Sequence, residues 1–234
     1  MINWHDPAVE LQVGHTALYL VNLCAGWYLW EFCVSFGFDW EHLMFRRPFR
    51  WTLIPYFGTR YACLLSVLVS MRISNVIYPI NNCTTWWLII MGTAHTAIAL
   101  ASLLLGLRVV ALAQQKLLVG IFLGTLWLGV VGTLVHGAVL IEATYVPQLL
   151  ACGVTRSEQT RVNFLATSIF DCICLILMFL LLQRARGSGL WKLLLSQGVL
   201  YFVVVIAAYV PATVLLMLNL NGGMNEVLQP VTRT

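Results

Sequence analysis

Several ionisable and polar side chains lie inside long apolar stretches of this sequence, where each needs a partner or a purpose. Asp171, His95, His136 and Tyr209 are of this kind, and Pro211 follows Tyr209 two residues later. A carboxyl group can act as an anion when it is ionised or as an acid when it is protonated. Imidazoles can donate hydrogen bonds to it or exchange protons with it. The four side chains therefore predict either a polar ligand-binding pocket or a structural Asp–His contact that fixes helix packing without any ligand.

Two opposite charges, Glu31 and Arg60, lie in the first two apolar stretches. Their positions allow a salt bridge, which would remove two lone charges from an apolar surrounding together. We interpret this predicted pair as structural, because it would lock two neighbouring helices. In an enzyme, Asp171 and Glu31 would instead be the candidate catalytic acids, with tryptophan walls that stabilise a cation.

The composition excludes a soluble globular protein. Of the 234 residues, 60% are hydrophobic and only 9% are charged, with a mean hydropathy of +0.86, whereas soluble domains are near a quarter charged. The start MINWHDPAVE contains no Lys or Arg, so no cleavable signal peptide is expected. No basic run indicates nucleic acid, no His/Cys spacing indicates a metal, and no motif indicates a cofactor.

Continuous apolar runs of about 20 residues, without the period-two alternation of barrel strands, predict transmembrane helices. The fold class is expected to be all-α, a polytopic transmembrane helix bundle with about six spans. Residues 1–218 would form this single bundle, and residues 219–234 a short polar tail. The predicted spans are Leu11–Phe36, Thr52–Val76, Trp86–Leu107, Leu117–Ile141, Phe164–Leu182 and Leu193–Leu218.

The depth of each polar residue follows from a helical rise of 1.5 Å per residue, counted from the outer end of its span. Asp171 would lie ~11 Å deep, His95 ~13 Å and His136 ~9 Å, with Tyr209 at a similar depth. The neighbouring small residues allow close helix contact or leave room for a ligand. We therefore expect one polar layer in the outer half of the bundle, which would open outward if it is a pocket.

Lysine and arginine gather in the loops after the odd-numbered spans, which predicts an N-terminus outside the cell or in the lumen. The basic loops would face the cytoplasm, where they meet lipid headgroups and offer a docking surface to a cytoplasmic partner. The bilayer is thus the first expected partner, and the plasma membrane or the endoplasmic reticulum the expected location. The loop residues are Arg46, Arg47, Arg50, Arg108, Lys116, Arg184, Arg186 and Lys192.

Two of the seven cysteines, Cys83 and Cys152, fall in predicted outer loops, whereas most of the others lie in spans. Outer loops of the secretory pathway are oxidising, so these two predict a disulfide, with two free thiols as the alternative. Asn82, Cys83 and Thr84 also match the glycosylation sequon on the same face. A disulfide at the middle residue and the nearby membrane would both hinder the transferase.

The stretch LWEFCVSFGFDWEHLMFRRPFRWTLIPYFGTRY, from Leu29 to Tyr61, resembles the signature region of a family of fungal, chiefly basidiomycete, multi-pass membrane proteins of unknown function. Trp-Glu-Phe at 30–32, Arg-Pro-Phe-Arg-Trp-Thr at 47–52 and Arg-Tyr at 60–61 carry the match. The resemblance implies outer-loop cysteines at Cys83 and Cys152 and an acid at Asp171. It also implies seven spans, the last of which this sequence lacks.

A receptor-like protein that binds a lipid-soluble small molecule is the leading functional hypothesis, supported by the outer N-terminus, the loop disulfide and the polar layer. The first alternative is a membrane-embedded enzyme that acts on an isoprenoid by acid catalysis, like a terpene cyclase. The second is a structural or assembly subunit of a membrane complex. A transporter is less favoured, because no inverted repeat is visible.

Overall fold

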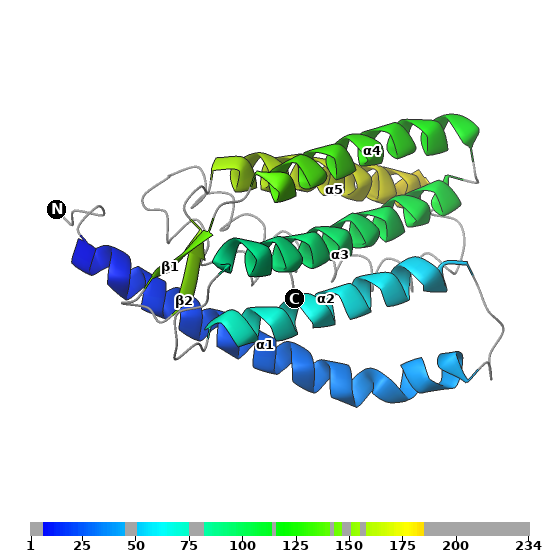
Figure 1. Cartoon of the computed structure of the whole chain (residues 1–234). Helices are drawn as coiled ribbons and strands as arrows, with labels where there is room; N and C mark the ends of the chain where they lie inside the picture. The colour runs from blue at the N-terminus through cyan, green and yellow to red at the C-terminus, as the bar shows by residue number, and fades with distance from the viewer. Residues whose placement is uncertain are drawn as a thin grey trace.

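The computed structural model describes residues 7–44, 51–74, 82–113, 116–140, 143–146, 151–154 and 158–184. Within these residues the chain forms five long helices and one two-stranded hairpin (Figure 1). The elements are α1 (Pro7–Leu43), α2 (Leu53–Ser74), α3 (Cys83–Leu112), α4 (Leu117–Val139), β1 (Ala143–Val146), β2 (Ala151–Val154) and α5 (Glu158–Arg184).

All five helices are long and apolar enough to cross a membrane, which confirms an integral membrane helix bundle for this part of the chain. The predicted spans one to five each match one helix. The predicted sixth span, Leu193–Leu218, lies outside the described residues, and so do Tyr209 and Pro211. Helix α1 continues past Phe36, the predicted end of the first span, to Leu43.

The helices lie side by side with α3 at the centre (Figure 1). Helix α1 packs on α2 and α2 on α3, while α3, α4 and α5 contact one another. The hairpin lies at the end of the bundle where α3 and α5 begin, which we call the hairpin end. Consequently α3 and α5 run in the same direction, and α4 runs in the opposite one.

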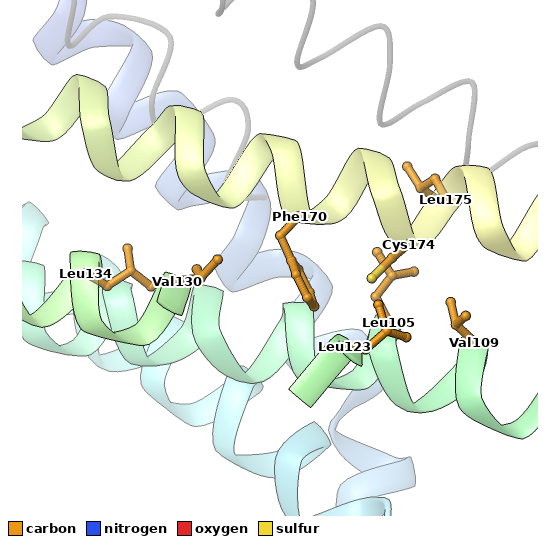
Figure 2. Close-up of a cluster of buried hydrophobic side chains, with 8 residues drawn as sticks. All are labelled: Leu105, Val109, Leu123, Val130, Leu134, Phe170, Cys174 and Leu175. Carbon is orange, nitrogen blue, oxygen red and sulfur yellow. The ribbon is translucent and has the colours of Figure 1, made fainter. Parts of the chain in front are cut away.

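The core of the bundle lies between α3, α4 and α5 (Figure 2). Apolar side chains recur along each helix at the spacing of one face and interdigitate, as close helix packing requires. Val109 and Cys174 are fully buried. The cluster consists of Leu105, Val109, Leu123, Val130, Leu134, Phe170, Cys174 and Leu175.

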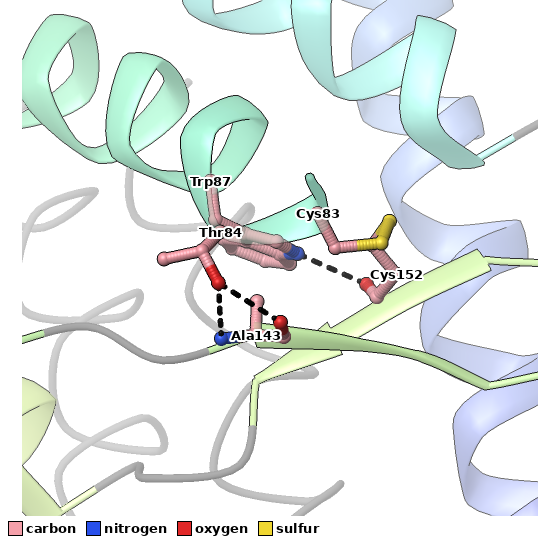
Figure 3. The surroundings of a disulfide bond; sticks show 5 residues. All are labelled: Cys83, Thr84, Trp87, Ala143 and Cys152. Atoms are coloured by element: carbon pink, nitrogen blue, oxygen red, sulfur yellow. Dashed lines mark hydrogen bonds between the residues drawn. A yellow bond between two sulfur atoms is a disulfide. The ribbon is translucent and has the colours of Figure 1, made fainter. Parts of the chain in front are cut away.

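A disulfide joins Cys83, the first residue of α3, to Cys152 in β2, which confirms the predicted bridge (Figure 3). The Trp87 indole N–H donates a hydrogen bond to the Cys152 carbonyl oxygen at 3.0 Å. The Thr84 hydroxyl donates to the Ala143 carbonyl at 3.1 Å and accepts from the Ala143 N–H at 3.4 Å. Both strands of the hairpin are therefore attached to the first turns of α3.

Replacing either Cys83 or Cys152 with serine should lower the free energy of unfolding by about 2–4 kcal/mol, since the bridge closes a long loop. The two half-cystines are 69 residues apart in the chain. Thermal unfolding of the detergent-solubilised protein, with and without reductant, measures this loss. Cys33→Ser is the control, because Cys33 is a free, exposed cysteine. A Cys152→Ser variant as stable as wild type would contradict the assignment.

Candidate ligand site between α3, α4 and α5

Asp171 of α5 faces α3 inside the bundle. The Ser102 hydroxyl donates a hydrogen bond to Asp171 Oδ1 at 2.8 Å. Ser102 is buried, while Asp171 is half-buried. This hydrogen bond fixes the direction of the Asp171 carboxyl group. The result is an oriented acid, still partly accessible, between two membrane-spanning helices.

Helix α4 also contacts α3 near Asp171. The Trp127 indole N–H donates a hydrogen bond to the Ala99 carbonyl oxygen of α3 at 2.8 Å. Ala99 precedes Ser102 by one helical turn, so Trp127 and Asp171 meet α3 at neighbouring levels. A tryptophan in a bundle core has to satisfy its N–H, and a bond to a helix carbonyl does so. Three helices are thus joined by polar contacts near Asp171.

Buried polar side chains continue from Asp171 toward the hairpin end. On α5, Thr167 is 4% exposed and Asn163 is 5% exposed, and the Thr167 hydroxyl donates to the Asn163 carbonyl at 2.9 Å. On α3, His95 is 8% exposed and lies on the face of Ser102, since seven residues are two turns. We call this set the polar seam; it consists of His95, Ser102, Asn163, Thr167, Ser168 and Asp171.

Among the predicted site residues that the structure describes, Asp171 and His95 do not lie in a single layer. Asp171 is level with Ser102, which lies two turns, or ~10 Å, along α3 from His95. Helix α5 begins further from the hairpin end than α3 does. Counting residues from the start of each helix therefore misjudges the depth of Asp171 relative to His95. His95 therefore lies nearer the hairpin end than Asp171.

His136 also lies toward the hairpin end. Its neighbour Gly137 packs directly against Asn163, which precedes Asp171 by eight residues, or ~12 Å. The His136 side chain is exposed on α4. Asp171 and Ser102 thus form one level of the seam, while His95, Asn163 and the turn around His136 form a second level nearer the hairpin end.

Arg60 of α2 forms its ion pair with Asp39 rather than with the predicted partner Glu31. Arg60 Nε lies 2.7 Å from Asp39 Oδ2, and Asp39 is completely buried. The guanidinium also donates to Ser35 Oγ at 2.6 Å and lies over the ring of Phe32, 4.6 Å from its centroid. Arg60 therefore joins α2 to α1 through several polar contacts at once.

The direction of each α1 side chain explains this correction. Phe32, Ser35 and Asp39 are three and four residues apart, so they share the face toward α2. Glu31 is rotated by about 100° from Phe32 and is exposed. Asp39 lies three residues beyond Phe36, the predicted end of the first span, and therefore was not predicted as a partner for Arg60.

The two candidate acids of the enzyme hypothesis are far apart. Glu31 lies on α1, which packs on α2, and Asp171 lies on α5, which packs on α3 and α4 (Figure 1). Helices α2 and α3 lie between them. The structure therefore does not bring Asp171 and Glu31 into one site.

The glycosylation sequon begins at Asn82, which is exposed directly before α3. Its other two residues are engaged, Cys83 in the disulfide and the Thr84 hydroxyl in hydrogen bonds to Ala143. An acceptor sequon needs an accessible Ser or Thr hydroxyl, so we expect modification only of chains that have not yet formed the hairpin contact.

Comparison with protein families finds no family model that matches the chain, and comparison with curated proteins finds no matching protein. No family is therefore identified for this chain, and the resemblance to the fungal membrane family remains a prediction from sequence motifs. What the fold and the site geometry establish is a multi-pass membrane protein with a polar seam through its central helices.

Proposed function

We propose that this protein binds a lipid-soluble small molecule at Asp171, in a receptor-like manner, between α3, α4 and α5. The observation that supports this function is the half-buried carboxylate held by the buried Ser102 hydroxyl at 2.8 Å. Intramembrane acids are rare, and they commonly mark ligand or ion sites. An acid that served only to fill space between helices would be replaced by an apolar residue at little cost.

The surroundings of Asp171 indicate the chemistry of the ligand. A carboxylate binds an ammonium group or a hydroxyl donor most strongly. The nearby core is apolar and includes Phe170 and Cys174. We therefore propose an amphiphilic ligand whose polar group meets Asp171 and whose apolar body lies along the helices.

The proposed orientation places the hairpin end outside the cell or in the lumen. The disulfide at this end favours an oxidising compartment. Lys116, at the opposite end between α3 and α4, agrees with a cytoplasmic face there. The seam then leads from the outer end of α5 toward Asp171, consistent with a ligand from that side.

The test compares thermal unfolding of wild type and Asp171→Asn before and after extensive detergent washing. A ligand present at 100 times its Kd stabilises the folded state by about 2.7 kcal/mol, so washing should lower the wild-type Tm by roughly 5–10 °C. Adding an organic extract of the source membranes should restore it. Asp171→Asn should respond to neither treatment.

A structural role is the second candidate, favoured by the Ser102–Asp171 hydrogen bond itself, which joins α3 to α5. In that case Asp171→Asn and Ser102→Ala would lower the Tm to a similar extent, and washing would leave wild type unchanged. Equal responses of wild type and Asp171→Asn to the extract would likewise overturn the binding proposal.

A further inference from the structure

The Ser168 hydroxyl is a buried polar group on α5. Ser168 is 9% exposed, and within the described part of the chain its Oγ atom has no hydrogen-bond partner. The hydroxyl of its neighbour Thr167 donates to the carbonyl oxygen of Asn163, four residues earlier, as hydroxyls inside helices commonly do. A buried hydroxyl without a partner costs free energy. The Ser168 oxygen is therefore available to a group that comes from outside the helix.

Ser168 and Asp171 lie on the same face of α5. They are three residues apart, so their Cβ atoms are about 5–6 Å apart. The Ser102 hydroxyl of α3 donates to the same carboxyl group, at 2.8 Å from Asp171 Oδ1. While a hydroxyl donates its proton, its oxygen keeps lone pairs that can bind a cation. Oxygen atoms from two helices thus lie close to one acid, and they belong to Ser102, Ser168 and Asp171.

These oxygen atoms indicate the kind of ligand. Oxygen is the preferred ligand atom of hard cations. One carboxylate neutralises one positive charge, whereas a divalent ion would leave a net charge among apolar helices, which is costly. No group of three His, Cys, Asp or Glu side chains among the described residues could hold a metal ion, so the ligand sets of transition metals are not found there. The arrangement therefore fits a small monovalent cation.

We infer that a sodium ion binds between Ser102, Ser168 and Asp171. Water completes its coordination shell, since Asp171 is half-buried rather than fully enclosed. The inference rests on the proposed function in one respect, that the Asp171 carboxylate is a binding group, and it does not require the amphiphilic ligand. An ammonium group on that ligand competes with the sodium ion for the same carboxylate. Sodium thus regulates the occupancy of the ligand site.

Thermal unfolding of the washed full-length protein in detergent tests the cation site. The protein is measured in about 0.15 M sodium chloride and in N-methylglucamine chloride of the same ionic strength. Sodium at about ten times its Kd should raise the wild-type Tm by roughly 3–6 °C relative to N-methylglucamine. Ser168→Ala should lose most of this shift while it keeps the Ser102–Asp171 hydrogen bond. Asp171→Asn, which removes the charge, should lose the shift as well.

Ser66 provides a matched control for Ser168. It is also 9% exposed, but its hydroxyl donates to the Ile90 carbonyl oxygen of α3 at 3.5 Å. Ser66→Ala removes the same atom from an equally buried position of another helix. This variant should keep the full sodium shift, even if its Tm is lower than that of wild type in both salts.

The proposal is overturned if the wild-type Tm is the same in both salts. It is equally overturned if Ser168→Ala and Ser66→Ala keep equal sodium shifts, which would indicate a general salt effect. The organic extract, added without sodium, tests the proposed function separately. A wild-type response to the extract with none to sodium would overturn the cation site alone, and a response to sodium with none to the extract would overturn the amphiphilic ligand alone.

Discussion

Replacing Asp39 with asparagine is expected to lower the free energy of unfolding by about 3–5 kcal/mol, because it breaks a buried ion pair. The substitution leaves the Arg60 guanidinium without the carboxylate that lies 2.7 Å from its Nε. Asp39 is fully buried and Arg60 is only 14% exposed, so water cannot replace the lost partner. Thermal or denaturant unfolding of the purified protein in detergent measures the change.

Two further variants separate this pair from the partner predicted from the sequence. Glu31→Gln should change the free energy of unfolding by less than about 0.5 kcal/mol, because Glu31 is exposed and makes no ion pair with Arg60 in the structure. The double variant Asp39→Leu with Arg60→Met should be more stable than either single variant, since no lone charge remains. If Glu31→Gln were as destabilising as Asp39→Asn, Glu31 would be the true partner.

Replacing Gly137 with alanine should destabilise the protein by about 1–3 kcal/mol through overpacking between α4 and α5. A Cβ atom at this position would come within 2.8 Å of Asn163 Cγ and 3.0 Å of its Oδ1. Asn163 is itself only 5% exposed and has little space to move. The expected result is a Tm several degrees below that of wild type.

Gly132 provides the matched control on the same helix, because no atom lies within 4 Å of a Cβ added there. Gly132→Ala should leave stability unchanged or raise it slightly, since alanine has the higher helix propensity. Adding Asn163→Ala to Gly137→Ala should recover part of the loss. Equal stability of Gly137→Ala and wild type would show that α4 and α5 do not approach closely at this point.

The membrane-spanning character and the disulfide were predictable because each follows from local properties. A helix that spans the bilayer has to be long and apolar, and this signal is read directly along the chain. Cys83 and Cys152 stood apart from the other cysteines because they lie between apolar runs. The β1–β2 hairpin between α4 and α5 was not foreseen, because eight short-strand residues in a loop carry no comparable signal.

The partner of Arg60 depended on a boundary that the sequence does not mark. Gly37 disfavours a helix by about 1 kcal/mol but does not stop one, and α1 runs through the residues from Gly37 to Glu41. Once the helix continues, Asp39 falls seven residues after Phe32 and on the same face. The seven-residue spacing from Phe32 to Asp39 indicates a shared helix face. It can be used only when α1 is known to continue past Phe36.

The candidate site was predictable in its central residue but not in its arrangement. Asp171 was identified as an acid in an apolar span, whereas its partner Ser102 was not predicted. Asn163 was placed just outside the predicted fifth span, although α5 begins earlier, at Glu158. The relative shift of α3 and α5 along the bundle arises from tertiary packing, and it decides which residues share a level.

Native mass spectrometry of the detergent-solubilised chain tests most directly whether a small molecule is held at Asp171. Wild type should show the mass of the 26.2 kDa polypeptide together with a species of discrete additional mass. Asp171→Asn should show the polypeptide alone, while Glu31→Gln, whose changed carboxyl lies on the far side of α2 and α3, should retain the added mass. Wild type without bound mass, or the same bound mass on wild type and Asp171→Asn, would contradict a ligand site at Asp171.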